Sequence, residues 1–292
     1  LNRIETLKEF MKVGFIWGVA YNLTVIFWLA MNIGTTPLIG LISMLAAVLY
    51  ASLNCTIICL IMGMLKSRYS QIWFWFLPFV WTTIEYIRNM DLQTGGPWTA
   101  LANTQLDFLT LVQNAEVTGI YGITFWLILL NVSIFNWIDS PFPEYSFAAV
   151  SIFILPWVTG ILLTPLPSSD NGNNLDIAVV QPNIHLSQKW KPGGARANIE
   201  SLLTLSEPAI NQGADVIIWP ESATSSYILQ GNQNYLKWIQ SILDDSKLLS
   251  GIPYYTGTKQ NKMIYNSAVL ISSDSVSKPY NKLILVPMAE YI

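Results

Sequence analysis

The hydrophobic and polar positions divide the chain into an apolar first half and a more polar second half. Between Lys12 and Lys66 there is no Asp, Glu, Lys, Arg or His. A helix needs about 20 apolar residues to cross a bilayer, so this stretch is long enough for two crossings. Polar and turn-forming residues at 32–37 interrupt it. The pattern therefore predicts one membrane helix over about 11–31 and another over about 37–65.

Three further apolar segments, each with aromatic residues near its ends, predict membrane helices over about 71–87, 117–138 and 145–165. This gives about five spans. Basic residues close to membrane helices mark the cytoplasmic side. With five crossings, residues 90–116 and everything after Pro165 then lie on the opposite side. The basic residues that share the cytoplasmic side are Lys8, Lys12, Lys66 and Arg68.

After the apolar half, a turn-rich linker is followed by alternating strand and helix patterns, which are typical of an α/β module. We expect a membrane domain over 1–166, a linker over 167–174 and the module over 175–292. The predicted strands are 177–180, 216–219, 248–254, 266–272 and 282–286, and the predicted helices are 195–212 and 235–246.

The composition agrees with a chain of which one part contacts lipid and the other contacts water. Of the 292 residues, 52% are hydrophobic and 11% are charged, which is too apolar for one ordinary soluble domain. The net charge of -3 provides no broad basic surface, so nucleic acid is not an expected partner. Cys55 and Cys59 lie on an apolar helix without other ligands, so we expect them to pack, and we predict no metal or cofactor.

The strongest chemical signal is Glu221, which follows Trp219 and Pro220 just past a predicted buried strand, where α/β folds build their sites. Alone, such a Glu is more often a solvated or capping residue. Lys282 and Glu290 follow in the sequence. A buried Lys beside a carboxylate can stabilise an oxyanion. Spacing alone agrees equally well with Lys282 as a surface amine paired with Glu290.

Several short motifs resemble, in order and spacing, the apolipoprotein N-acyltransferase family, whose catalytic module belongs to the nitrilase (carbon-nitrogen hydrolase) superfamily. The resemblance implies a multi-span α-helical membrane domain plus an α/β nitrilase-like αββα sandwich, the latter incomplete. The motifs are Ile177 to Asn183, Trp219-Pro220-Glu221, Tyr280-Asn281-Lys282, Val286-Pro287 and Glu290-Tyr291, with Glu85, Arg88, Gly96-Pro97-Trp98, Gln105, Gly119 and Tyr121-Gly122 in the membrane half.

By this resemblance Glu221 is the general base, Lys282 stabilises the tetrahedral intermediate, and Glu290 is a second active-site carboxylate. Trp190 matches a functionally important Trp that contacts substrate, although packing of its loop is an equal alternative. His185, the only histidine, receives no role. The family's nucleophilic cysteine lies downstream of the lysine. We therefore expect a chain truncated at both ends, and inactive as it stands.

The implied activity is transfer of a phospholipid sn-1 acyl chain to the N-terminal diacylglyceryl-cysteine of apolipoproteins through a thioester. The implied location is the bacterial inner membrane, with the catalytic domain in the periplasm. The alternatives are a membrane-tethered nitrilase-type amidase and a non-catalytic lipid-binding membrane protein or transporter.

Two smaller hypotheses concern single segments. Residues 227–229 could form an apolar lip that dips toward the bilayer, with ordinary core packing as the alternative. Glu85 and Arg88 lie three apart on one helical face, so they could anchor a loop or meet a lipid headgroup, but a structural ion pair is favoured.

Overall fold

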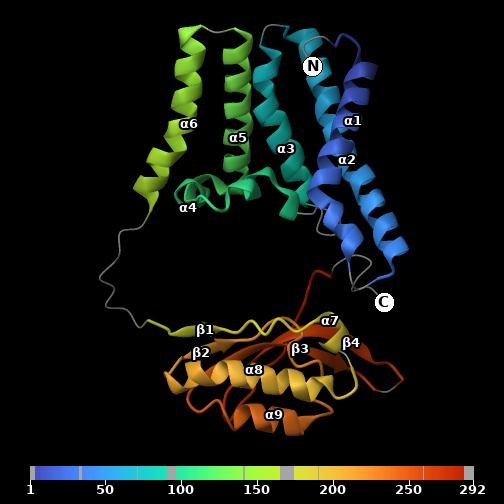
Figure 1. Ribbon diagram of the computed structural model, residues 1–292, viewed down its shortest axis with the longest axis vertical. Helices are drawn as coiled ribbons and strands as arrows, with labels where there is room; N and C mark the ends of the chain where they lie inside the picture. The colour runs from blue at the N-terminus through green and yellow to red at the C-terminus, as the bar shows by residue number, and fades with distance from the viewer. Residues whose placement is uncertain are drawn as a thin grey trace. The chain divides into compact units, whose positions relative to one another are not determined.

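The computed structural model describes residues 4–32, 35–70, 72–90, 97–140, 142–164, 174–189, 191–258 and 260–285. The chain forms two compact units, Leu1–Ser169 and Asp170–Ile292 (Figure 1). Each unit is described by itself.

The first unit opens with a pair of long helices that pack closely together (Figure 1). Helix α1 (Leu7–Ile26) begins at a capping box between Thr6 and Glu9 and continues into the 3-10 helix η1 (Phe27–Met31). Helix α2 (Pro37–Arg68) begins at Thr36 with proline at its first turn. A Cβ added to Gly14 would lie 2.7 Å from the Cβ of Cys59. The two buried cysteines thus pack against glycines of α1, in the role that their apolar setting indicates.

The other helices of this unit include α5, which lies between α3 and α6 (Figure 1). Gly119 has a φ of +64° and kinks α5 near its start. The elements are η2 (Trp73–Phe76), α3 (Leu77–Met90), η3 (Pro97–Thr99), η4 (Leu101–Gln105), α4 (Leu109–Val112), α5 (Ala115–Asp139) and α6 (Pro143–Leu163).

Within the described part of the chain, four helical segments are long and apolar enough to cross a membrane: Leu7–Met31, Pro37–Arg68, Ala115–Asp139 and Pro143–Leu163. They agree with four of the predicted spans. The fifth predicted span, 71–87, corresponds to η2 and α3. Helix α3 has 14 residues and extends about 21 Å at 1.5 Å per residue, less than the roughly 30 Å of a bilayer core. A fifth crossing there stays a prediction.

The described residues of the second unit form a five-stranded mixed sheet in the order β1-β2-β3-β4-β5. The first three strands are parallel, whereas β3, β4 and β5 pair antiparallel. The strands are β1 (Ile177–Val179), β2 (Val216–Ile218), β3 (Lys247–Thr256), β4 (Met263–Ile271) and β5 (Tyr280–Asn281), and the helices are α7 (Leu186–Lys189), α8 (Gly194–Asn211) and α9 (Gln233–Gln240).

Two predicted elements differ from the structure. Helix α9 ends at Gln240 rather than near residue 246, because the chain turns there and Asp244 has a φ of +49° that no α-helix accepts. The last strand pairs through Tyr280 and Asn281 rather than over 282–286. Residues 282–285 are described without strand structure.

The core lies between the sheet and helices α8 and α9, which cover the same face (Figure 1). Ile199 and Leu202 of α8, Ile217 of β2 and Leu248 of β3 are fully buried, each contributing about 1.5–3 kcal/mol. Along β3, buried and more exposed residues alternate, as expected for a sheet with one covered face. The unit supplies one helix layer and one sheet layer of the expected αββα arrangement.

The apolar lip hypothesis is wrong for its two aliphatic residues. Ile228 is 0% exposed, and Leu229 packs against the same core. Tyr227 meets Tyr255 edge to face. Core packing, the alternative interpretation of this segment, is correct because a hydrophobic side chain inside the core cannot contact lipid.

Candidate active site

Glu221 leaves the sheet immediately after β2, where the backbone is firmly held. Trp219 is 3% exposed. Its indole Nε1 donates to Ser206 Oγ at 2.9 Å, and its backbone N–H donates to Leu249 O at 2.9 Å. Pro220 has no N–H and cannot continue the ladder. The sequence therefore stops the strand and turns the carboxylate out of the sheet, as expected for the Trp-Pro-Glu segment.

The turn that carries Glu221 lies directly against β3. Ala223 N–H donates to Gly251 O at 2.8 Å. A Cβ at Gly251 would lie 2.7 Å from both Glu221 Cα and Ser222 N. Ser222 has a φ of +51°, which is uncommon for a residue with a side chain. Glycine at position 251 is what lets the turn approach this closely.

Lys282 meets Glu221 across the site. The distance from Lys282 Nζ to Glu221 Oε1 is 3.1 Å, although 61 residues separate the two in sequence. The side chains are 29% and 61% exposed, respectively. An ion pair this exposed contributes little to stability. Its significance is therefore positional: it sets an ammonium group beside a carboxylate at the end of the parallel strands.

Asn266, on β4, joins the two residues and was missed in the sequence. Its side-chain Nδ2 donates to Glu221 Oε1, and its backbone O accepts from Lys282 N at 2.8 Å. Ser222 Oγ lies 3.4 Å from Asn266 Oδ1. The only sequence signal is a polar residue within a strand-like run, and that signal does not distinguish a site residue from a solvated one.

Lys189 supplies a second ammonium group near the same turn. Its Nζ donates to the backbone O of Glu221 at 3.2 Å. Burial lowers the pKa of Lys189, while the negative charge of Glu221 acts in the opposite direction. Asn198, which is 4% exposed, donates to Lys189 O at 3.1 Å and fixes the end of α7. The sequence reasoning did not select either residue.

A hollow lies beside this turn. Gln181, Pro182 and Asn183 line it together with Lys189 and Pro220. The first three belong to the Ile177 to Asn183 segment, so that motif forms a wall of the site region. Gln181 Nε2 donates to Asn183 Oδ1 at 3.0 Å.

The structure brings two of the four predicted site residues together, Glu221 and Lys282. Trp190 and Glu290 lie outside the described residues. Pairing of Lys282 with Glu290 is consequently not described, whereas pairing with Glu221 is. His185 is exposed.

In the helical unit, Glu85 is 5% exposed but well satisfied. Thr124 Oγ1 donates to its Oε1 at 2.7 Å, and Leu101 N donates to its Oε2 at 3.1 Å. The expected ion pair between Glu85 and Arg88 is wrong, because among the described residues the ion pair found is that of Lys282 and Glu221. The carboxylate instead ties α3 to α5 and to η4.

Comparison with known proteins agrees with this layout. Residues 1–133 match the family model of the apolipoprotein N-acyltransferase N-terminal domain. Residues 176–292, which carry Glu221 and Lys282, match that of carbon-nitrogen hydrolase. The fold and site thus define a carbon-nitrogen hydrolase domain that follows a membrane helical unit. Both parts of the chain are thus similar to parts of apolipoprotein N-acyltransferases.

The similar proteins are themselves named apolipoprotein N-acyltransferase. The chain is 29% identical to the apolipoprotein N-acyltransferase of Geobacter metallireducens, over 98% of this chain and 57% of the relative. It is 27% identical to that of Haemophilus ducreyi over the same shares. It is 30% identical to that of Pseudomonas syringae pv. tomato, over 73% of this chain and 42% of the relative. The chain thus spans about half the length of these relatives.

Proposed function

We propose that the protein is an acyltransferase that moves the sn-1 acyl chain of a phospholipid to the N-terminal diacylglyceryl-cysteine of an apolipoprotein. The single observation that carries the proposal is the 3.1 Å contact between Lys282 Nζ and Glu221 Oε1. It supplies a base and a cation at one point of a domain that matches carbon-nitrogen hydrolases. The printed name of the relatives, apolipoprotein N-acyltransferase, supports an apolipoprotein as the acceptor.

In the first step, Glu221 takes the proton of the nucleophilic cysteine thiol that the family resemblance implies. The thiolate attacks the sn-1 ester carbonyl carbon and forms a tetrahedral oxyanion. Lys282 stabilises that negative charge. When the ester C–O bond breaks, the lysophospholipid oxygen leaves with the proton that Glu221 holds. The acyl group remains as a thioester.

In the second step, the α-amino group of the diacylglyceryl-cysteine attacks the thioester carbonyl. An α-amino group has a pKa near 8 and is mostly protonated at neutral pH, so it first loses a proton. Glu221 accepts the amine proton as the C–N bond forms, and returns it to the sulfur as the C–S bond breaks. The product is an amide, and the thiol is restored. Lys282 again faces the oxyanion.

Both proposed substrates are lipids, which gives a physical reason for joining this domain to membrane helices. The four segments of membrane length place the helical unit in a membrane. The bacterial inner membrane, with the catalytic domain in the periplasm, is the location that we propose. Glu290, as a second carboxylate, and Trp190, as a substrate contact, remain part of the proposal.

The test uses the complete protein as its gene encodes it, reconstituted in phospholipid vesicles with a diacylglyceryl lipopeptide. Mass spectrometry should find one acyl chain added to the lipopeptide for each lysophospholipid formed. Glu221→Gln should abolish both products. Release of free fatty acid without lipopeptide acylation would contradict the proposal.

A second candidate follows from the family match over residues 176–292. It is hydrolysis of a small amide by the same residues, with water as the acceptor. The same reconstituted protein, supplied with amide substrates, separates the two functions. Ammonia or amine release that exceeds acyl transfer would favour the amidase.

A further inference from the structure

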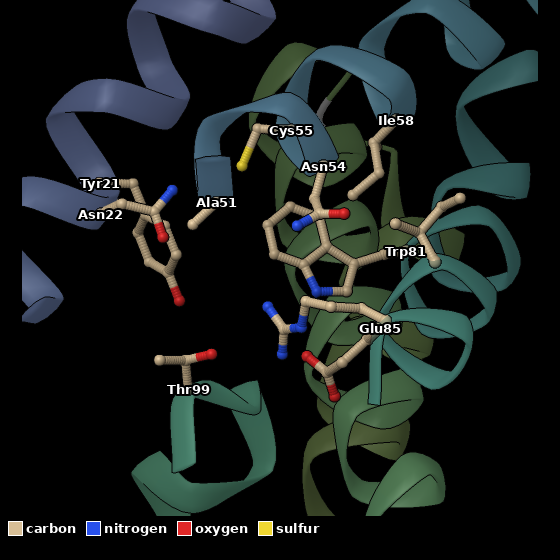
Figure 2. A pocket seen from close by; sticks show the side chains of 11 residues that line it. Tyr21, Asn22, Ala51, Asn54, Cys55, Ile58, Trp81, Glu85 and Thr99 are labelled. Atoms are coloured by element: carbon tan, nitrogen blue, oxygen red, sulfur yellow. The ribbon is translucent and has the colours of Figure 1, made fainter. Parts of the chain in front are cut away.

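A polar pocket lies inside the helical unit, far in sequence from Glu221. Figure 2 shows side chains from several elements projecting into it. Tyr21 comes from α1, Asn54 from α2 and Thr99 from η3, and Arg88 of α3 also lines it. The space inside it is about 30 Å³, which is enough for one small polar group but not for a whole small molecule.

Arg88 is the side chain in this pocket whose hydrogen-bonding capacity is not satisfied. Its Nε donates to Asn89 Oδ1 at 3.3 Å, but its Nη2 is buried without a hydrogen-bond partner in the described structure. No carboxylate of the described residues lies within ion-pair distance of it. Leaving a guanidinium donor buried and unpaired is costly, more so inside a membrane unit. An anionic oxygen would remove that cost, because guanidinium binds phosphate and carboxylate oxygens in a fork geometry.

Three further lining residues add neutral hydrogen-bonding groups. Tyr21 and Thr99 contribute hydroxyls, and Asn54 contributes an amide. Glu85 also lines the pocket (Figure 2). Its two oxygens already accept from Thr124 and from the backbone of Leu101. Its negative charge still opposes a dianion, so a singly charged anion fits this pocket better.

The position of the pocket selects the kind of anion. Arg88 lies in the last turn of α3, and Thr99 ends the short η3 helix. The pocket is thus at the end of α3, within a unit of membrane-length segments, whereas the α2 residues that line it lie midway along that helix. Headgroups lie where membrane helices end, and the phosphodiester of a phospholipid has one negative charge at neutral pH.

We propose that this pocket binds the phosphodiester group of a phospholipid, with Arg88 as its cationic partner and with Tyr21, Asn54 and Thr99 as the surrounding polar groups. The pocket belongs to the helical unit, whereas Glu221 and Lys282 belong to the other unit. It does not depend on the proposed acyl transfer, and lipid could bind there whether or not the chain catalyses a reaction.

The test is binding to the full chain in neutral detergent micelles, followed by native mass spectrometry. The probes are dihexanoyl-phosphatidylglycerol, dihexanoylglycerol, which has no phosphate, and inorganic phosphate. We expect the phospholipid to bind at least tenfold more tightly than the other two. Arg88→Gln should weaken binding of the phospholipid at least tenfold, and Arg88→Lys should weaken it less. Arg68→Gln, at the exposed end of α2, is the matched control and should change affinity less than twofold.

A second measurement, chemical modification of arginine, needs no substituted protein and so does not depend on a variant that folds. Phenylglyoxal modifies arginine, and peptide mapping of the unsubstituted chain gives the rate at each position. Dihexanoyl-phosphatidylglycerol should slow modification of Arg88 at least fivefold and leave Arg68 unchanged. Equal protection of both arginines, or equal binding of dihexanoylglycerol, would overturn the proposal. Protection by inorganic phosphate at the same concentration would overturn the assignment to a lipid.

Discussion

Gly251 and Glu221 are in backbone contact: a Cβ added to Gly251 would lie 2.7 Å from Glu221 Cα. Because β3 approaches the turn this closely, the position of the proposed base depends on a residue with no side chain. The same glycine accepts from Ala223 N–H at 2.8 Å, so the contact is also a hydrogen-bonded one.

Gly251→Ala should therefore move Glu221. We expect a loss of about 1–3 kcal/mol in unfolding free energy, as for other overpacked sites, and a fall in turnover of about 100-fold from misplacement of the base. Thermal unfolding and acyl-transfer assays measure the two effects. Gly231→Ala is the control, since its nearest neighbour would be Tyr227 O at 3.7 Å. Equal behaviour of the two variants would contradict the close approach.

Asn266→Ala should test whether this side chain positions Glu221. It removes the donor to Glu221 Oε1 but leaves the backbone bond to Lys282 in place. We expect kcat to fall about 100-fold with little change in KM, because the substrate-binding surface is not altered. Asn261→Ala, at an exposed position before β4, serves as the control. A change in KM alone would show that Asn266 contacts substrate instead.

The structure of the second unit could be predicted well where local pattern decides it. The apolar runs at 177–180 and 216–219 form β1 and β2, although Ile177 and Val179 of β1 are exposed rather than buried. The Trp-Pro-Glu segment places Glu221 past the strand end as expected. The pairing of Glu221 with Lys282 came from family resemblance. Spacing alone does not distinguish it from a surface pair with Glu290, because 61 residues of intervening fold decide which groups meet.

What the sequence could not provide are contacts made across strands. Asn266 reaches Glu221 because β4 pairs antiparallel with β3 beside the end of β2, and no short-range pattern encodes that register. The prediction of an apolar lip at 227–229 was wrong for a related reason. An apolar triplet is the same pattern whether it faces lipid or a core, and burial of Ile228 depends on α9 and the sheet.

Ile228→Asp is consequently expected to unfold the second unit rather than to weaken lipid contact. A charge without a partner in the core should cost more than about 4 kcal/mol. Leu205→Asp on α8 is the control, since Leu205 is 48% exposed. Circular dichroism melting of the full chain measures both. A folded Ile228→Asp protein that loses only lipid binding would restore the lip.

Thr124→Val should expose the role of the buried Glu85 carboxylate. The change removes the donor to Glu85 Oε1 and the acceptor of the Ala102 N–H. It should lower stability by about 1–3 kcal/mol, since buried polar groups are left unsatisfied. Thr83→Val, at an exposed position of α3, should have little effect. Thermal unfolding in detergent measures the difference, and equal melting temperatures would show that Glu85 does not depend on Thr124.

The most direct test of the account is a double-mutant cycle of Glu221→Gln and Lys282→Met, with acyl-transfer kcat/KM as the measurement. If the two residues 3.1 Å apart act as one catalytic unit, each single variant should lose about 100-fold to 10,000-fold. The double variant should then be no worse than the weaker single variant. Lys278→Met, at an exposed position before β5, should retain activity. A double variant whose loss equals the product of the two single losses would show that the residues act independently and would contradict the account.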